Sequence, residues 1–192
     1  MEGWWAASYL VLWLMVGVLT IVVVALARQI GTLHLRLGPR GALELDDEGP
    51  PLGEAPESFH GWDLDGREVT IGGPGEAQLL MFVSPGCTLC DQVMPSLPGV
   101  ATSAGMTSYV VTDLDPAEAA SAFSAKRTPS PVVAAPDIVR SYDVPGTPYI
   151  VMLDTRGVVR AKGTPNNLEQ VEGLVDTARR RIDGPTHERR AG

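Results

Sequence analysis

Cys87 and Cys90 are the residues of this sequence whose type and spacing point most directly to chemistry. Two thiols separated by two residues can carry out thiol–disulfide exchange, in which one thiolate attacks a disulfide and the second thiol resolves the mixed disulfide. We expect Cys87 to be the nucleophile and Cys90 the resolving residue. The sequence therefore predicts a redox-active cysteine pair.

The elements around the pair favour this interpretation. Residues 78–83 form a continuous apolar run of strand length, typical of a strand buried on both faces. Ser84, Pro85 and Gly86 end that run, and we expect a helix to begin near Cys87. Residues three apart lie on the same side of the first turn, and the free N–H groups there stabilise a thiolate.

Three other roles for the cysteines stay open. Half of a zinc site would need further ligands, and His34, His60 and His187 lack ligand spacing. The cysteines could be buried structural residues, although a position between a strand and a helix disfavours this. A purely structural disulfide would close so short a loop that it removes little chain entropy. We expect neither a metal nor a cofactor.

A second candidate feature is Gly146-Thr147-Pro148, just before an apolar run at 149–153. That run and residues 158–162 predict an antiparallel hairpin that turns at 154–157. Pro148 taken alone could be an ordinary turn proline.

The rest of the soluble part predicts strands that alternate with helices. We expect a hairpin at 62–71 turning at Asp65-Gly66, strands at 109–112 and 131–135, helical segments at 116–127 and 137–142, and a final helix from Asn166 or Asn167 to about Ile182. These elements predict an α/β fold with a mixed sheet flanked by helices.

The amino-terminal region predicts a membrane anchor. Residues 4–27 carry no charge, and Trp4, Trp5 and Tyr9 suit a headgroup layer. A cleaved signal peptide is the alternative, but the run is long and no basic residue precedes it. We expect an anchor at 1–28, a juxtamembrane segment and acidic linker at 29–51, a folded domain at 52–182 and a disordered basic tail at 183–192.

Charge and length restrict the function classes. The chain has 192 residues, and 15 Lys and Arg stand against 23 Asp and Glu, for a net charge of -8. That length suits one domain with an appendage. The acidity disfavours nucleic acid as a partner, because phosphate contacts need clustered cations.

These features together resemble the thioredoxin superfamily. The resemblance rests on the strand before the Cys87 pair, on Pro95 five residues past Cys90, and on Gly146-Thr147-Pro148 before a hairpin. It implies that Pro148 is cis and packs against the cysteines, and that the backbone of Thr147 pairs with a substrate chain. It also implies that Pro95 kinks the first helix, and that Pro85, Gly86 and Gly146 shape the site.

Some positions depart from the superfamily pattern. Leu89 stands where thioredoxins usually have proline, and Gly86 stands where they have tryptophan. Met81 occupies the position of a buried carboxylate in many thioredoxins, so water or another group must handle the proton at Cys90. Asp91 should disfavour a thiolate at Cys90.

The resemblance narrows to membrane-anchored extracytoplasmic thioredoxins, whose extra strand and helix resemble residues 131–142. Residues 27–36, followed by Pro39-x-Gly41-Ala42-Leu43, resemble the MauD family, accessory proteins in methylamine dehydrogenase maturation. This implies a membrane-anchored thiol–disulfide oxidoreductase. Its client would be a cysteine-containing protein such as a methylamine dehydrogenase subunit, with an unidentified electron donor or acceptor.

Two functions other than thiol–disulfide exchange are also compatible with parts of the sequence. A peroxiredoxin-like peroxidase needs a serine or threonine three residues before its cysteine, and Ser84 meets this condition. It also needs a proline four residues earlier, and Leu80 at that position does not meet this second condition. A non-catalytic module could hold a client beside Pro148.

The sequence carries opposing signals about which side of the membrane holds the folded domain. Arg28, Arg36 and Arg40 follow the apolar run, which by the positive-inside rule favours a cytoplasmic domain. Persistent disulfides and the family resemblance favour the extracytoplasmic side, which we expect.

Overall fold

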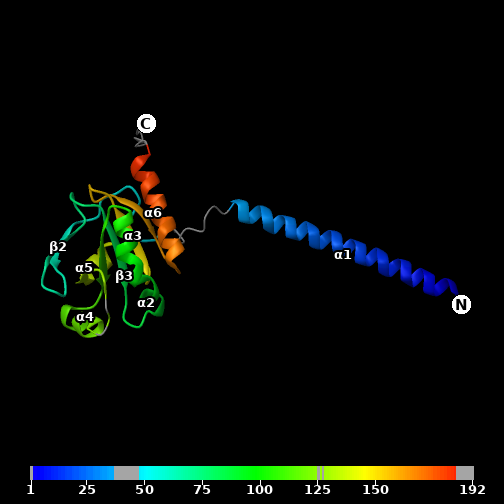
Figure 1. Ribbon diagram of the computed structural model, residues 1–192, viewed down its shortest axis with the longest axis horizontal. Helices are drawn as coiled ribbons and strands as arrows, with labels where there is room; N and C mark the ends of the chain where they lie inside the picture. Colours follow the sequence, from blue (N-terminus) through cyan, green and yellow to red (C-terminus); the bar gives the residue numbers. More distant parts are fainter. Residues whose placement is uncertain (1, 37–47, 125, 127, 185–192) are drawn as a thin grey trace. The chain divides into compact units, whose positions relative to one another are not determined.

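The computed structural model describes residues 2–36, 48–124, 126 and 128–184, and divides the chain into two compact units, Met1–Pro39 and Arg40–Gly192. In the first unit the helix α1 runs from Glu2 to Arg36 (Figure 1). Its segment Gly3–Val24 is long and apolar enough to cross a membrane, and none of it is buried. The sequence-based expectation of an amino-terminal apolar helix is confirmed.

The second unit is built on a five-stranded mixed sheet with the order β5-β4-β3-β6-β7. The strand β4 is parallel to both of its neighbours, β3 and β5, whereas β6 is antiparallel to both β3 and β7. Their bounds are Gln78–Val83 for β3, Thr107–Thr112 for β4, Val132–Ala134 for β5, Tyr149–Leu153 for β6 and Val159–Gly163 for β7. A separate hairpin pairs β1 (Phe59–Trp62) with β2 (Glu68–Ile71).

Alternating side chains of the central strand β3 divide the core into two layers. Leu79, Met81 and Val83 pack with residues of the helices on one face, and Leu80 and Phe82 pack with β2 and α5 on the other. Every residue of β3 is buried, as its apolar run predicted. The helices are α2 (Thr88–Val93), α3 (Leu97–Ser103), α4 (Pro116–Phe123), α5 (Pro136–Ser141) and α6 (Leu168–Asp183).

Local signals in the sequence place most element ends correctly. The side chain of Asn167 caps α6 by accepting from the backbone N–H of Gln170, as one of the two expected caps. The helix expected at 116–127 is shorter, because α4 ends at Phe123, where Ser124 turns its hydroxyl back to the Ser121 carbonyl. The expected helix end at Gly38-Pro39, most of the acidic linker and most of the basic tail lie outside the described residues. The domain limits at 28, 51 and 182 stay predictions.

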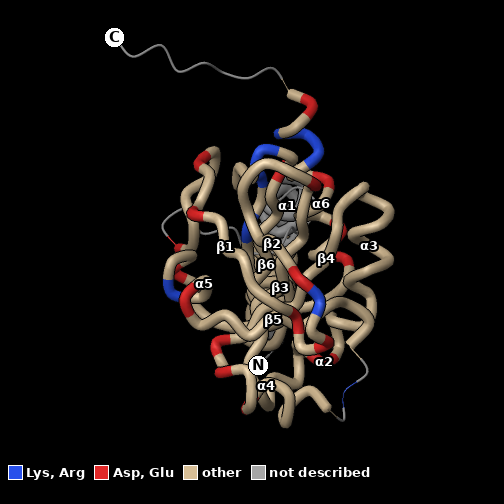
Figure 2. The backbone as a smooth tube through the Cα atoms, turned by 90° about the vertical axis from the view of Figure 1, so that its left-hand side faces the viewer, with Lys and Arg blue, Asp and Glu red and all other residues tan. Residues whose placement is uncertain are grey.

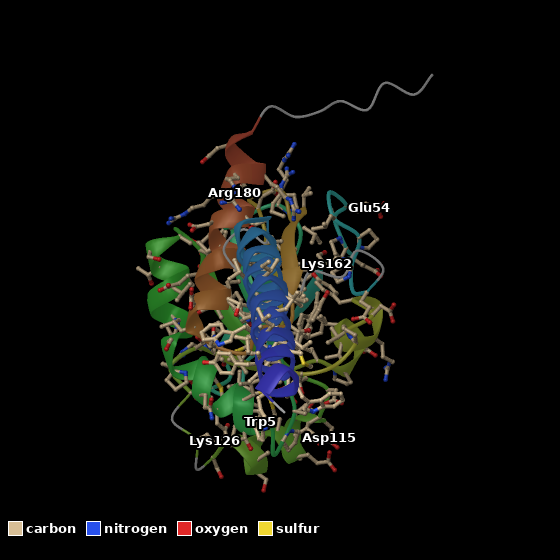
Figure 3. The ribbon with its side chains drawn as sticks, turned by 90° about the vertical axis from the view of Figure 1, so that its right-hand side faces the viewer. Trp5, Glu54, Asp115, Lys126, Lys162 and Arg180 are labelled. Atoms are coloured by element: carbon tan, nitrogen blue, oxygen red, sulfur yellow. A yellow bond between two sulfur atoms is a disulfide. The ribbon has the colours of Figure 1, made fainter. Side chains whose placement is uncertain are left out.

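The segment 48–54 runs along the outer side of β7. The Glu48 carbonyl accepts from the Tyr149 hydroxyl at 3.1 Å and from the buried Lys162 Nζ at 2.6 Å. Farther along, Gly53 N–H donates to the Val159 carbonyl and Val159 N–H donates to the Glu54 carbonyl, both at 2.9 Å. Figure 3 labels Lys162 and Glu54 on this side of the domain. The chain therefore enters the domain fastened to β6 and β7.

Candidate active site

The two cysteines form a disulfide at the start of α2. Their sulfurs are 2.09 Å apart and their Cα atoms are 5.2 Å apart. Cys87 is the N-cap residue, and its Sγ accepts from the backbone N–H of Cys90 at 3.1 Å. The helix begins where the sequence predicted, and a backbone N–H group points at the Cys87 sulfur. Such a donor favours a thiolate over a thiol at this position.

The two cysteines differ in exposure. Cys90 is fully buried in the core beside Val93, whereas Cys87 is partly exposed at the edge of that cluster. A client disulfide can reach only a sulfur that faces solvent, and the buried sulfur can then attack within the protein. The geometry thus gives the two cysteines different roles in an exchange reaction.

The turn before Cys87 depends on glycine. Gly86 has φ +77°, in the left-handed region that other residues rarely adopt, and Cys87 N–H donates to the Ser84 carbonyl at 3.3 Å. Pro85 and Gly86 are both exposed in this turn. A residue with a side chain would be strained in this left-handed backbone, which suits the glycine at this position.

The loop 146–148 lies next to this turn. The Thr147–Pro148 peptide bond is cis, Pro148 is buried, Thr147 is partly exposed and Gly146 is exposed. The hydroxyl groups of Ser84 and Thr147 are 2.9 Å apart and share a hydrogen bond. Residues 63 positions apart in sequence are thereby brought together, and no local pattern in the sequence indicated this pair. A hollow of about 120 Å³ is lined by Ser84, Gly146 and Thr147 together with residues from the ends of β3 and β4 and from α5.

Pro95 interrupts the first helical segment, as expected. The helix α2 ends at Val93, a 3-10 turn spans Met94–Ser96, and α3 begins at Leu97. Proline has no N–H to donate to the preceding turn, so an α-helix cannot continue through it unbroken. Pro95 itself is exposed.

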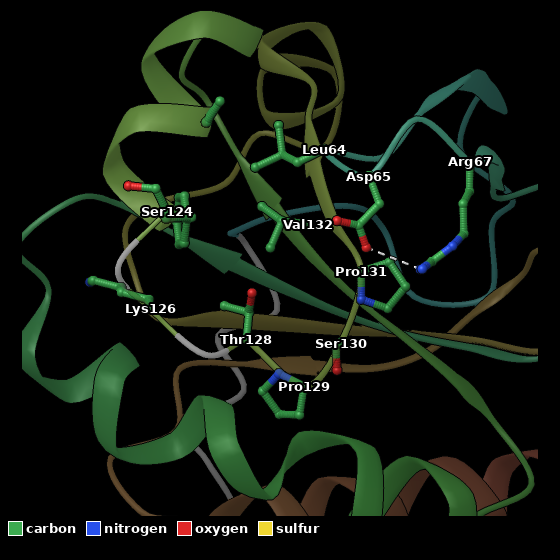
Figure 4. A pocket seen from close by; sticks show the side chains of 12 residues that line it. Leu64, Asp65, Arg67, Ser124, Lys126, Thr128, Pro129, Ser130, Pro131 and Val132 are labelled. Atoms are coloured by element: carbon green, nitrogen blue, oxygen red, sulfur yellow. Dashed lines mark ion pairs between the residues drawn. The ribbon is translucent and has the colours of Figure 1, made fainter.

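The charge nearest to Cys90 in sequence is paired. The Asp91 carboxylate accepts from the Lys126 Nζ at 2.7 Å, and the same Nζ lies 5.7 Å from the centroid of the Phe123 ring. Lys126 also lines a hollow of about 440 Å³ beside β5, where Figure 4 shows it with the Asp65–Arg67 ion pair. The lysine offsets the negative charge that Asp91 places next to Cys90, and nothing in its local sequence indicated this partner.

The buried hydroxyl of Tyr142 supplies no acid or base at neutral pH. Burial raises the pKa of Tyr142 to about 12, and its ring packs on Phe82 with centroids 5.7 Å apart. In the described part of the chain, no group of three or more His, Cys, Asp and Glu residues could hold a metal ion. The chemistry that this geometry supports is that of the two sulfurs.

Comparison with known proteins extends over almost the whole chain. The chain is 34% identical over 183 residues to the methylamine utilization protein MauD of Paracoccus denitrificans, covering 93% of this chain and 91% of that one. It is 35% identical over 175 residues to MauD of Methylorubrum extorquens, covering 88% and 84%. No protein-family model matches the chain.

Solved structures share the fold of the second unit. The thioredoxin domain of a thiol–disulfide oxidoreductase from Bacteroides vulgatus matches with 25% identity and a TM-score of 0.52, over 65% of this chain and 97% of that one. A thiol:disulfide interchange protein from Bacteroides sp. matches with 22% identity and a TM-score of 0.53, over 73% and 96%. The predicted thioredoxin-like fold is confirmed.

Proposed function

The chain belongs to the MauD family and is a thioredoxin-like thiol–disulfide oxidoreductase; on this premise we propose that it forms, reduces or isomerises disulfides in an exported client protein. The observation that carries the proposal is the Cys87–Cys90 disulfide at a helix start, with one sulfur partly exposed and the other buried. This asymmetry is what a two-step exchange requires.

In the reducing direction, the Cys87 thiolate attacks a client disulfide. A bond forms between Cys87 Sγ and one client sulfur, and the other client sulfur leaves as a thiolate that takes up a proton. Cys90 Sγ, having lost its proton, then attacks Cys87 Sγ, which restores the disulfide of the protein and releases the second client thiol. Two electrons pass from the cysteine pair to the client, and the reverse sequence oxidises a client dithiol. An electron donor or acceptor must reset the pair after each turnover.

The loop 146–148 is the proposed docking site for the client chain. Thr147 is partly exposed beside the turn that carries Cys87, and its hydroxyl is held by Ser84. An extended client segment can pair with the Thr147 backbone, as peptides do when they add a strand to a free edge. Gly146 leaves room for that approach, because it has no side chain.

We assign the client as a methylamine dehydrogenase subunit, on the strength of the MauD relatives, and the domain to the extracytoplasmic side of the membrane. Disulfides persist in that compartment. An impermeant thiol reagent applied to intact, reduced cells should label Cys87. Labelling that requires lysis of the cells would place the domain in the cytoplasm.

Trapping of a mixed disulfide tests the function itself. In a methylamine-grown host, full-length Cys90→Ala should accumulate a covalent adduct that reducing agent releases, because no second thiol resolves it. The double variant Cys87→Ser/Cys90→Ala is the matched control and should form none. Mass spectrometry of the released protein should identify the dehydrogenase subunit. Absence of any adduct from the Cys90→Ala protein would contradict the exchange function, and another client would contradict the partner assignment alone.

A further inference from the structure

Arginines gather at the end of the sheet opposite the cysteines. We call Arg156, Arg160, Arg179, Arg180 and Arg181 the basic end; they are five of the nine lysines and arginines described between residues 48 and 184. Figure 2 shows the basic segment of α6 at one extremity of the domain, and Figure 3 labels Arg180 and Asp115 at opposite extremities. Elsewhere this domain is predominantly acidic.

A hollow of about 450 Å³ opens within the basic end. Its floor is apolar, from Ala77, Ala104 and Met106, which lie at or next to the starts of β3 and β4 and the end of α3. Arg156, Arg160 and Arg179 line the hollow, with Ile182 beside them at 42% exposure. The site combines cationic groups with an apolar surface, and its lining includes two acidic residues, Asp154 and Asp183.

The arginine side chains of α6 donate hydrogen bonds to uncharged acceptors. Arg179 donates to the Ser103 carbonyl, Arg180 to the Thr177 hydroxyl at 3.0 Å and Arg181 to the Arg160 carbonyl at 2.9 Å. Among the described residues, no carboxylate forms an ion pair with Arg179 or Arg180. The guanidinium groups of Arg179 and Arg180 are therefore positioned by contacts that leave their positive charge uncompensated.

The β-hairpin arginines are held differently. Arg160 pairs with the Asp154 carboxylate at 2.7 Å, and Arg156 approaches the same group at 3.5 Å. The Asp154 side chain is only 7% exposed, so its charge is largely withdrawn from the surface. At 65% exposure Arg156 presents its charge to solvent, close to the exposed carboxylates of Glu76 and Asp183.

We propose that the basic end docks on the anionic phospholipid surface of the membrane to which the chain is anchored. Planar guanidinium groups match phosphate oxygens, and the apolar floor and Ile182 suit the glycerol and first acyl carbons of a lipid. The helix α1 has the length and composition to cross a bilayer, so lipid is present at high effective concentration and weak contacts suffice. This proposal is independent of the exchange reaction.

Docking in this way has a consequence for the cysteines. The hollow includes Ala77, directly before β3, while Cys87 follows the other end of that strand. Six residues of strand span about 20 Å. The membrane-docked domain would therefore hold Cys87 about that far from the lipid headgroups and open to a soluble client.

Hydrogen exchange of the full-length protein in nanodiscs tests the proposal. Nanodiscs of phosphatidylcholine alone are compared with nanodiscs that contain phosphatidylglycerol. Amides in residues 155–160 and 178–184 should exchange at least about fivefold more slowly in the anionic discs. Each arginine near an anionic surface strengthens membrane association by roughly fivefold, and the associated surface is protected from exchange. The protection should disappear at 0.5 M NaCl.

Matched variants separate docking from a general effect of charge. Arg179→Gln/Arg180→Gln/Arg181→Gln should abolish the lipid-dependent protection and leave client exchange unchanged. Arg67→Gln/Arg140→Gln removes two exposed arginines away from the basic end and should keep the protection. Equal exchange in both kinds of disc would overturn the proposal. Protection in neutral discs by inorganic phosphate alone would also overturn it, and would indicate a site for a free anion instead.

Discussion

The two ends of the central sheet use polar groups in different ways. At the cysteine end, the contacts closest to the sulfurs are a disulfide, a backbone N–H to sulfur and a hydroxyl pair between Ser84 and Thr147, all of them uncharged, and the neighbouring Asp91 pairs with Lys126. At the other end, the buried Asp154 carboxylate accepts from two backbone N–H groups and from Arg160. A buried carboxylate thus helps to fix the fold at one end, whereas at the other end the Asp91–Lys126 pair is partly exposed and the groups that contact the sulfurs are uncharged.

The Asp154 network is more complete than a similar turn in the β1–β2 hairpin. Asp63 also begins an Asp-x-x-Gly turn and accepts from the backbone N–H groups of Asp65 and Arg67, yet one of its buried oxygens has no hydrogen-bond partner among the described residues. Burial alone would raise the pKa of Asp154, but hydrogen bonds from Val158, Arg160 and Arg156 outweigh it and hold that pKa below its ordinary value. The buried Asp154 carboxylate is paired closely, with Arg160 at 2.7 Å, whereas Arg67 lies 3.7 Å from Asp63 and pairs more closely, at 3.1 Å, with the exposed Asp65.

The largest expected effect is at the cysteine end. Cys87→Ser should lower the rate of disulfide exchange by about 1000-fold or more, because it removes the attacking sulfur. Its stability should fall by no more than about 2 kcal/mol, the chain-entropy value for a loop this short. Turnover of a fluorescent disulfide peptide and urea unfolding measure the two quantities. Substantial turnover by the variant would remove Cys87 from the role of nucleophile.

The next effect lies at the charged end and concerns stability. Asp154→Asn should destabilise the domain by about 2 kcal/mol at pH 7, since it breaks charge-assisted hydrogen bonds of a buried group. Because the folded-state pKa of Asp154 is lowered, its stabilisation is fully present above about pH 4 and is lost as the pH falls through the folded value.

Urea unfolding at a series of pH values checks this prediction. The stability difference between the two proteins should shrink as the pH falls below about 4. Exchange activity of the folded variant should match that of the parent chain. A large loss of activity in folded protein would show that the two ends are not separate.

A smaller effect is expected from the hydroxyl pair. Ser84→Ala leaves Thr147 without its 2.9 Å partner, so the docking loop should be less well held. We expect KM for a client peptide to rise about fivefold, the equivalent of one hydrogen bond, with kcat nearly unchanged. Steady-state kinetics on the reduced protein measure both constants. A fall in kcat with constant KM would instead tie Ser84 to the sulfur chemistry.

The smallest effect is expected from a buried group that belongs to neither end. The Tyr142 hydroxyl is buried, and no hydrogen-bond partner for it is found among the described residues. Tyr142→Phe keeps the ring that packs on Phe82, so stability should change by less than about 0.5 kcal/mol. Thermal unfolding measures it. A loss of more than about 2 kcal/mol would reveal a partner for the hydroxyl.

Local patterns predicted what depends on neighbours in sequence. The buried strand before Cys87 follows from apolar periodicity, and the cap at Asn167 follows from side-chain chemistry at a helix start. Contacts between distant residues could not be derived in this way. Lys126 reaches Asp91 across 35 residues, and Ser84 reaches Thr147 across 63, and neither pair leaves a periodic signal.

The basic end combines a feature that local sequence shows with a contact that it does not show. The arginine run at 179–181 was visible in the sequence, but its meeting with Arg156 and Arg160 depends on how α6 packs beside β7. The early end of α4 has a local cause instead, because the Ser124 hydroxyl donates to the Ser121 carbonyl in the last turn. Helix propensity alone favoured a longer element.

The hydrogen bonds of Gly53 and Glu54 to Val159 also bear on self-association. They occupy outward-facing groups of β7, the terminal strand of the sheet, which would otherwise offer a template for another chain. A soluble form released by cleavage after Glu54 would lose this shield and should aggregate more readily. A form cut before Glu48 keeps the shield and should aggregate less readily.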